Sequence, residues 1–119
     1  MNLDNGKTYI VTASGIVGDP NTPFTLLIND AGREAASDTN NVDIAVLHGS
    51  TNAPAVDVDA VLVANDVITN LAYGENTGYL GLPPAKYDFA VRAAGDPDVV
   101  ASFRADLSGL KGGAAYVFA

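Results

Sequence analysis

The chain has 119 residues, a length that suits one domain with a core of its own. It contains no cysteine, which excludes disulfides, thiolate catalysis and cysteine-ligated metals. Its 14 acidic and 6 basic residues give a net charge of -8, so we expect neither nucleic acid nor an anionic membrane as a partner. No apolar run approaches the roughly 20 residues that span a bilayer, so no membrane insertion is expected.

Alternation of apolar and polar residues with a period of two dominates the chain. Tyr87, Phe89 and Val91, for example, share one face of an extended segment. In chain order, we predict strands over 7–17, 24–29, 42–48, 55–63, 66–72, 77–82, 86–93, 98–107 and 114–119. Frequent glycine, proline, aspartate and asparagine residues leave few gaps long enough for a helix. Many short strands between turns predict an all-β, antiparallel β-sandwich.

A short motif near the start of the chain recurs near its end. The identical positions are Leu3, Gly6 and Tyr9 in the first copy and Leu110, Gly113 and Tyr116 in the second, 107 positions later. Coincidence is one explanation, because hairpins share such turn chemistry. The other is an internal repeat.

The repeat interpretation divides the chain into three parts. Residues 1–29 are then the closing strands of a repeat unit, residues 30–41 are a polar linker, and residues 42–119 are the main β-sandwich body. The body lacks a final strand, and residues 18–29 are a copy of that strand. We expect residues 7–29 to complete a sandwich in their own chain or in a neighbouring one, since an unpaired sheet edge is a template for strand addition.

Residues 42–119 carry several motifs in a fixed order. They are Val46–Val58, which contains His48, Ser50, Pro54 and Asp57, then Asn70–Gly74, Gly78–Pro83, Tyr87–Gly95 and Leu110–Ala119. In this order they resemble the domain-of-unknown-function family number 4397. Two positions depart from the family pattern: Asn52 replaces the common Asp, and Pro84-Ala85-Lys86 replaces an Ala-Gly-Thr turn.

The resemblance implies an immunoglobulin-like module of secreted or cell-surface bacterial and archaeal proteins, often present in tandem copies. It therefore implies an extracellular or cell-surface location, with neighbouring copies of the module as partners. The family has no agreed biochemical activity, so the resemblance supplies no reaction. We expect its signature residues to be structural: His48, Ser50, Pro54, Asp57, Tyr73 and Tyr79.

His48 is the only histidine, at the end of a predicted strand. We expect it at the margin of the core, hydrogen-bonded to the backbone or to Asp57. The alternative is a Ser50–His48–Asp57 catalytic trio, but Ser50 lies in a predicted turn without the strand-turn-helix geometry of a nucleophile elbow.

Asp57 and Asp59 share one face of a predicted strand, with Asp66 close in sequence. We expect a solvated strand face, and calcium is the alternative, although the segment lacks the loop and closing glutamate of an EF-hand. Tyr73, Tyr79 and Tyr87 are expected to fill the core with their hydroxyls at its rim, and an aromatic platform for sugars is the alternative.

These observations predict a non-enzymatic extracellular structural or adhesive repeat module, with assembly into a tandem array or filament by strand complementation as one option. We expect no cofactor, metal or catalytic residue, and neighbouring copies or a surface ligand as partners. The alternative function is a small-ligand or carbohydrate-binding β-sandwich module.

Overall fold

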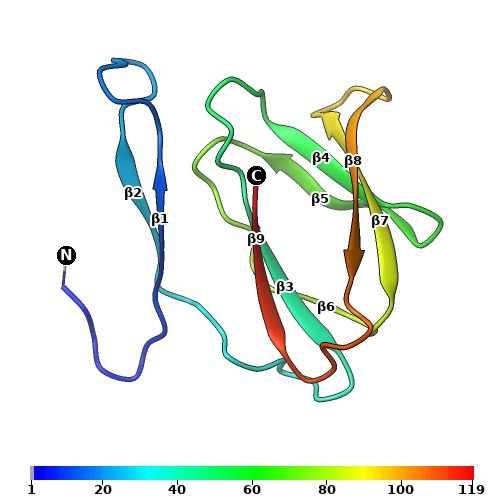
Figure 1. Ribbon diagram of the computed structural model, residues 1–119. Helices are drawn as coiled ribbons and strands as arrows, with labels where there is room; N and C mark the ends of the chain where they lie inside the picture. The colour runs from blue at the N-terminus through cyan, green and yellow to red at the C-terminus, as the bar shows by residue number, and fades with distance from the viewer. Residues whose placement is uncertain (1) are drawn as a thin grey trace. The chain divides into compact units, whose positions relative to one another are not determined.

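The computed structural model describes residues 2–119 and contains only strands as regular structure (Figure 1). The strands are β1 (Ile10–Ser14), β2 (Thr25–Asn29), β3 (Val42–Leu47), β4 (Val56–Ala60), β5 (Ala64–Leu71), β6 (Leu80–Leu82), β7 (Lys86–Ala93), β8 (Val99–Asp106) and β9 (Ala114–Phe118). Each overlaps a strand predicted from the alternation, and the prediction of an all-β chain is confirmed. The described residues include no helix that could cross a membrane.

The chain divides into two compact units, with the division between Glu34 and Ala35. This point falls within the polar segment 30–41 that we predicted to be a linker. The end of that segment is tied to the second unit, because the Ala36 N–H donates to the Gly112 carbonyl at 2.9 Å.

The first unit is a β-hairpin in which β1 and β2 pair antiparallel, from Ile10 opposite Asn29 to Ser14 opposite Thr25. The strands are joined by a compact loop. Its first residue, Gly15, has a φ of +91°, and a Cβ there would overlap the carbonyl of Pro23. Only glycine fits this bend without strain.

One apolar face of the hairpin is not covered by the rest of the first unit. Val11 lies opposite Ile28, and Ala13 opposite Leu26, so all four side chains share a face. Val11, Leu26 and Ile28 are 45%, 50% and 44% exposed. An isolated two-stranded sheet is only marginally stable in water, and this one leaves its apolar face half in solvent.

The second unit consists of two sheets, one with the strand order β6-β3-β9 and the other with the order β5-β4-β7-β8. All neighbouring strands are antiparallel except β3 and β9, which run parallel from Asp43 beside Ala114 to Leu47 beside Phe118. β3 and β4 are consecutive in the chain but lie in different sheets (Figure 1).

The two sheets of the second unit share one apolar core, which follows from the period-two alternation. Its buried members come from both sheets: Val42, Ile44, Val58, Ala60, Ile68, Leu71, Tyr87, Phe89 and Leu107. Burying each large aliphatic or aromatic side chain contributes about 1.5–3 kcal/mol, so this cluster is the main stabilising feature of the unit.

Three predicted strands are clearly shorter than expected. The segment 7–17 is a strand only over Ile10–Ser14, because Gly15 turns the chain at its end. The segment 55–63 ends as a strand at Ala60, because residues 61–63 form an exposed turn with Leu62 at a φ of +64°. The segment 77–82 forms a regular strand only from Leu80. Thr77 still contacts β3: its N–H donates to the Val46 carbonyl, and its Oγ1 accepts the Val46 N–H, both at 2.8 Å. Apolar content misled the prediction for 55–63. In 77–82, the side-chain oxygen of Thr77 takes the place of a backbone acceptor for Val46.

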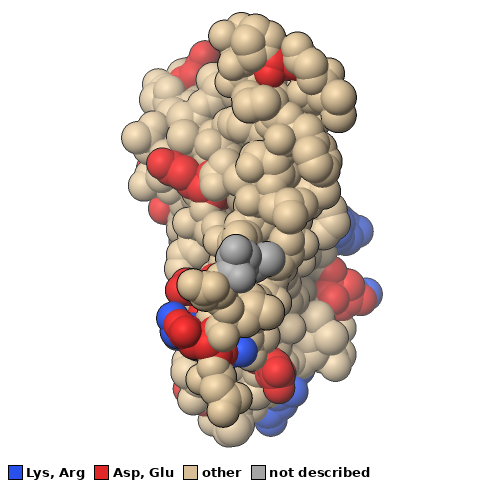
Figure 2. Space-filling view, turned by 90° about the vertical axis from the view of Figure 1, so that its left-hand side faces the viewer, with Lys and Arg blue, Asp and Glu red and all other residues tan. Residues whose placement is uncertain are grey.

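The surface charge is dispersed. Figure 2 shows acidic side chains and fewer basic ones scattered among mostly uncharged residues. On this face, the described residues form no continuous basic surface.

Candidate functional site

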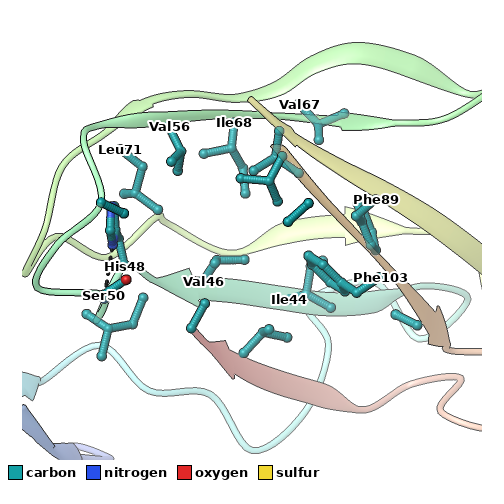
Figure 3. A pocket seen from close by; sticks show the side chains of 18 of the residues that line it. Ile44, Val46, His48, Ser50, Val56, Val67, Ile68, Leu71, Phe89 and Phe103 are labelled. Atoms are coloured by element: carbon teal, nitrogen blue, oxygen red, sulfur yellow. Dashed lines mark hydrogen bonds between the residues drawn. The ribbon is translucent and has the colours of Figure 1, made fainter. Parts of the chain in front are cut away.

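A cavity of about 480 Å³ lies between the two sheets of the second unit (Figure 3). Its walls are almost entirely apolar. His48 and Ser50 lie at one end, and Phe89 and Phe103 lie at the other. Protein cores normally have few voids larger than a water molecule. A space of this size therefore means that the two sheets do not close on each other.

The cavity is open on the side where β8 and β9 lie. These two strands are edges of their sheets, while the opposite edges, β5 and β6, lie close enough to line a second pocket together. Phe103 and Val100 of β8 line the cavity, yet they are 41% and 68% exposed. The apolar interior is therefore in contact with solvent along β8.

His48 follows β3 and is buried at the polar end of the cavity. Its Nε2–H donates to the Pro54 carbonyl at 2.8 Å, and its Nδ1 accepts the Ser50 N–H at 3.3 Å. These two bonds fit the neutral tautomer with its proton on Nε2. The Tyr73 ring packs edge-on against the imidazole, with 6.3 Å between centroids. His48 thus fixes the shape of the loop that follows β3.

The Ser50–His48–Asp57 alternative is not assembled. The Ser50 hydroxyl donates to Asn52 Oδ1 at 3.2 Å, and both nitrogens of His48 are bonded to backbone groups. Asp57 is bonded elsewhere, since its carboxylate accepts the N–H groups of Asn70 and Gly95 at 2.8 and 3.0 Å. We expected His48 to be hydrogen-bonded either to the backbone or to Asp57, and both of its hydrogen bonds are to backbone groups.

Arg92 of β7 lies among the three acidic residues that raised the calcium alternative. Its guanidinium donates to Asp59 at 2.9 and 3.0 Å and to Asp66 at 2.6 Å, and it lies 3.9 Å from Asp57. The guanidinium thus already brings a positive charge to all three carboxylates. Among residues 2–119, no group of three or more histidine and acidic side chains is arranged to hold a metal.

The same network sets the ionisation of the two strand aspartates. The hydrogen bonds from Arg92 lower the pKa of Asp59 below its ordinary value. The backbone N–H groups of Gly95 and Asn70 lower the pKa of Asp57, with a smaller contribution from the charge of Arg92. Both carboxylates are therefore ionised and satisfied in the folded protein.

The three tyrosines occupy different environments. Tyr87 is buried in the core beside Phe89, and its hydroxyl donates to the Pro83 carbonyl at 2.6 Å. Tyr73 contacts His48, and Tyr79 lies in the segment that leads into β6. Tyr87 therefore contributes to the core and is not available to an exposed aromatic platform.

Sequence reasoning missed two features of this unit: the role of Arg92 and the open cavity beside β8. The alternation places Arg92 on the polar face of its strand, but its partners depend on the register that sets it beside Asp57. The cavity depends on how the sheets pack, which no local pattern encodes.

The second unit is thus a domain of two packed β-sheets with an apolar cavity open along one side. The chain belongs to the family described as domain of unknown function, DUF4397, whose model matches residues 42–119. The family resemblance proposed from the sequence motifs is therefore confirmed. No curated protein and no solved structure shows significant similarity to the chain.

Proposed function

We propose that this chain is a non-enzymatic structural or adhesive module of an extracellular or cell-surface array, in which each domain bears tension between its ends. The observation that carries the proposal is the parallel pairing of β3 and β9. These are the first and last strands of the second unit.

The geometry of this pairing favours resistance to extension. Because β3 and β9 run in the same direction, a force applied at the start of β3 and the end of β9 pulls the strands past each other. All hydrogen bonds between Asp43–Leu47 and Ala114–Phe118 are then loaded at once. A force that peels the strands apart from one end loads them one after another.

Forced unfolding of single molecules tests this function, since the absence of cysteine allows two attachment points to be introduced freely. In the full chain, Ala35→Cys with Ala119→Cys pulls β3 and β9 in shear. Asn52→Cys with Ala119→Cys is the matched control, because both handles then lie at the same end of the strand pair. We expect a higher unfolding force in shear, and equal forces would refute the mechanical role.

The immunoglobulin-like description belongs to the same proposal. Two packed, mostly antiparallel sheets support it, whereas the strand order departs from it. The first two strands of an immunoglobulin domain share a sheet, but β3 and β4 do not. Resistance to extension requires only the pairing of β3 with β9 and does not depend on this strand order.

The surface location rests on the family resemblance, which implies modules of secreted and cell-surface proteins. The acidic net charge of -8 suits a protein exposed to solvent. Protease treatment of intact cells tests the location: we expect the domain to be cleaved or released without lysis. Protection until the cells are lysed would contradict it.

The second candidate function, binding of a small ligand, is favoured by the cavity. Its volume of about 480 Å³ lies within the range of known ligand sites. The apolar walls suit an aliphatic or aromatic molecule rather than a sugar. A shift in melting temperature with such molecules, absent with sugars, would support this candidate.

A further inference from the structure

We propose that the cleft between β8 and β9 is closed by the β1–β2 hairpin of a second copy of this chain, with β2 running antiparallel along the outer edge of β9. This inference rests on the proposed function and names the contact that joins one module to the next.

The acceptor is an apolar cleft with an available sheet edge. β9 pairs with β3 on one side and ends its sheet on the other, and β8 likewise ends the second sheet. Val100 and Phe103 expose apolar surface between the two edges. An uncovered sheet edge beside apolar side chains is the arrangement that strand addition completes.

The donor is the hairpin itself. It presents Val11, Leu26 and Ile28 on one half-exposed face, as described above. A two-stranded sheet needs further strands or a packed face for independent stability. The edge of β9 has room for a further strand, and the apolar side chains in the cleft are exposed. The hairpin can supply both a strand and an apolar face.

The sequence indicates that the donor should be a copy of this chain rather than an unrelated peptide. Leu3, Gly6 and Tyr9 repeat as Leu110, Gly113 and Tyr116 at the turn before β9. On this alignment Ile10 corresponds to Val117, so the start of β1 is a copy of the end of β9, and β2 is the strand that pairs with this copy. Both turns also contain a glycine with positive φ, Gly6 at +84° and Gly112 at +80°, which agree to within one residue of the alignment.

The pairing edge of β2 determines which of its faces meets the cleft. Val117 of β9 lines the cavity, and it corresponds to Ile10 of β1. If β2 paired with β9 through the same edge that it uses to pair with β1, Leu27 would therefore face the cavity. In an intact hairpin that edge of β2 is already paired with β1. Antiparallel addition through the other edge rotates β2 by half a turn about its axis and directs Leu26 and Ile28 into the cleft. This orientation buries the apolar face.

Sedimentation of the full chain and its variants tests the inference. Ile28→Glu places a charge on the donor face, and Val100→Glu places one at the mouth of the acceptor. Val100 is largely exposed, so the latter change is expected to preserve folding. The matched controls are Thr25→Glu, on the other face of β2, and Ser102→Glu, on β8 next to Phe103. Thr25 and Ser102 are both exposed.

We expect the wild type and both controls to associate head to tail as concentration rises. Ile28→Glu alone and Val100→Glu alone should each remain monomeric. Their mixture should form one-to-one dimers and nothing larger, because only one intact hairpin and one intact cleft remain between the two molecules.

The inference is overturned if the mixture stays monomeric, if either variant alone associates like the wild type, or if Thr25→Glu abolishes association while Ile28→Glu does not. A wild type that stays monomeric at every concentration also overturns it, and binding of a small apolar probe in the cleft would then assign the cavity to a ligand. If the chain does not associate but still unfolds at a higher force in shear than in peeling, the hairpin contact is rejected and the mechanical function stands. If the chain associates but the two unfolding forces are equal, the mechanical function is rejected and the hairpin contact stands.

Discussion

Arg92 and Asp59 lie on neighbouring strands and are joined by two hydrogen bonds, from Nε and from a terminal guanidinium nitrogen to the two carboxylate oxygens, at 2.9 and 3.0 Å. The same guanidinium reaches Asp66 of β5, so one cation connects three strands of the larger sheet. This geometry makes Arg92 a cross-link on the outer face of the domain.

Replacement of Arg92 by methionine is expected to lower the melting temperature at neutral pH. The change keeps most of the side-chain length but leaves the carboxylates of Asp57, Asp59 and Asp66 to repel one another. Arg104→Met is the control, because Arg104 pairs with Asp88 in an exposed position where ion pairs contribute little. Equal thermal shifts in the two variants would contradict the role of the network.

The stability of the domain is expected to fall in acid. The pKa values of Asp57 and Asp59 are lowered in the folded state, so their contribution is present above the ordinary carboxyl value of about 4 and is lost as the pH falls through the folded values. Thermal unfolding measured from pH 7 to pH 2 should show this decline. Asp59→Asn should flatten it, and an unchanged slope would count against the assignment.

His48→Phe should lower the free energy of unfolding by about 1–3 kcal/mol, because it leaves the Pro54 carbonyl and the Ser50 N–H without their partner. His48→Gln, which retains a donor and an acceptor, should lose less. Denaturant unfolding of both variants measures the difference. A phenylalanine variant as stable as the wild type would show that the loop does not depend on these bonds.

Tyr87→Phe removes the hydroxyl that donates to Pro83 and is expected to cost about 0.5–1.5 kcal/mol. Burial raises the pKa of Tyr87, so the folded state disfavours its ionised form. Stability is then constant below the ordinary tyrosine value of about 10 and declines as the pH rises toward the folded value. The phenylalanine variant should lose part of this alkaline decline, and an identical profile would contradict the assignment.

The strands were predictable because their signal is local. Alternation places Tyr87, Phe89 and Val91 on one face whatever the partner strands are, and these residues do line the interior. The turn at residues 61–63 was not predictable from the same signal, because Val61, Leu62 and Val63 are apolar and yet exposed. Apolar character alone does not distinguish a strand from a turn.

The candidate site was predictable only where a residue acts on its own neighbours. His48 bonds to groups two and six residues away, within reach of local reasoning. The bonds of Arg92 to Asp59 and Asp66 span 33 and 26 residues and depend on strand register. The open side of the cavity depends on the packing of β8 and β9, which only the assembled sheets reveal.

Site-directed disulfide formation between two single-cysteine variants tests the central contact most directly. Antiparallel pairing of β2 with β9 along their full five-residue lengths, through the free edge of β2, places Thr25 beside Phe118, both on the outer surface of the extended sheet. Mixing Thr25→Cys with Phe118→Cys under mild oxidation should give a mixed disulfide dimer, whereas Thr25→Cys with Asp88→Cys should not. No mixed dimer, or an internal disulfide in a monomer that carries both cysteines, would contradict closure of the cleft by a second copy.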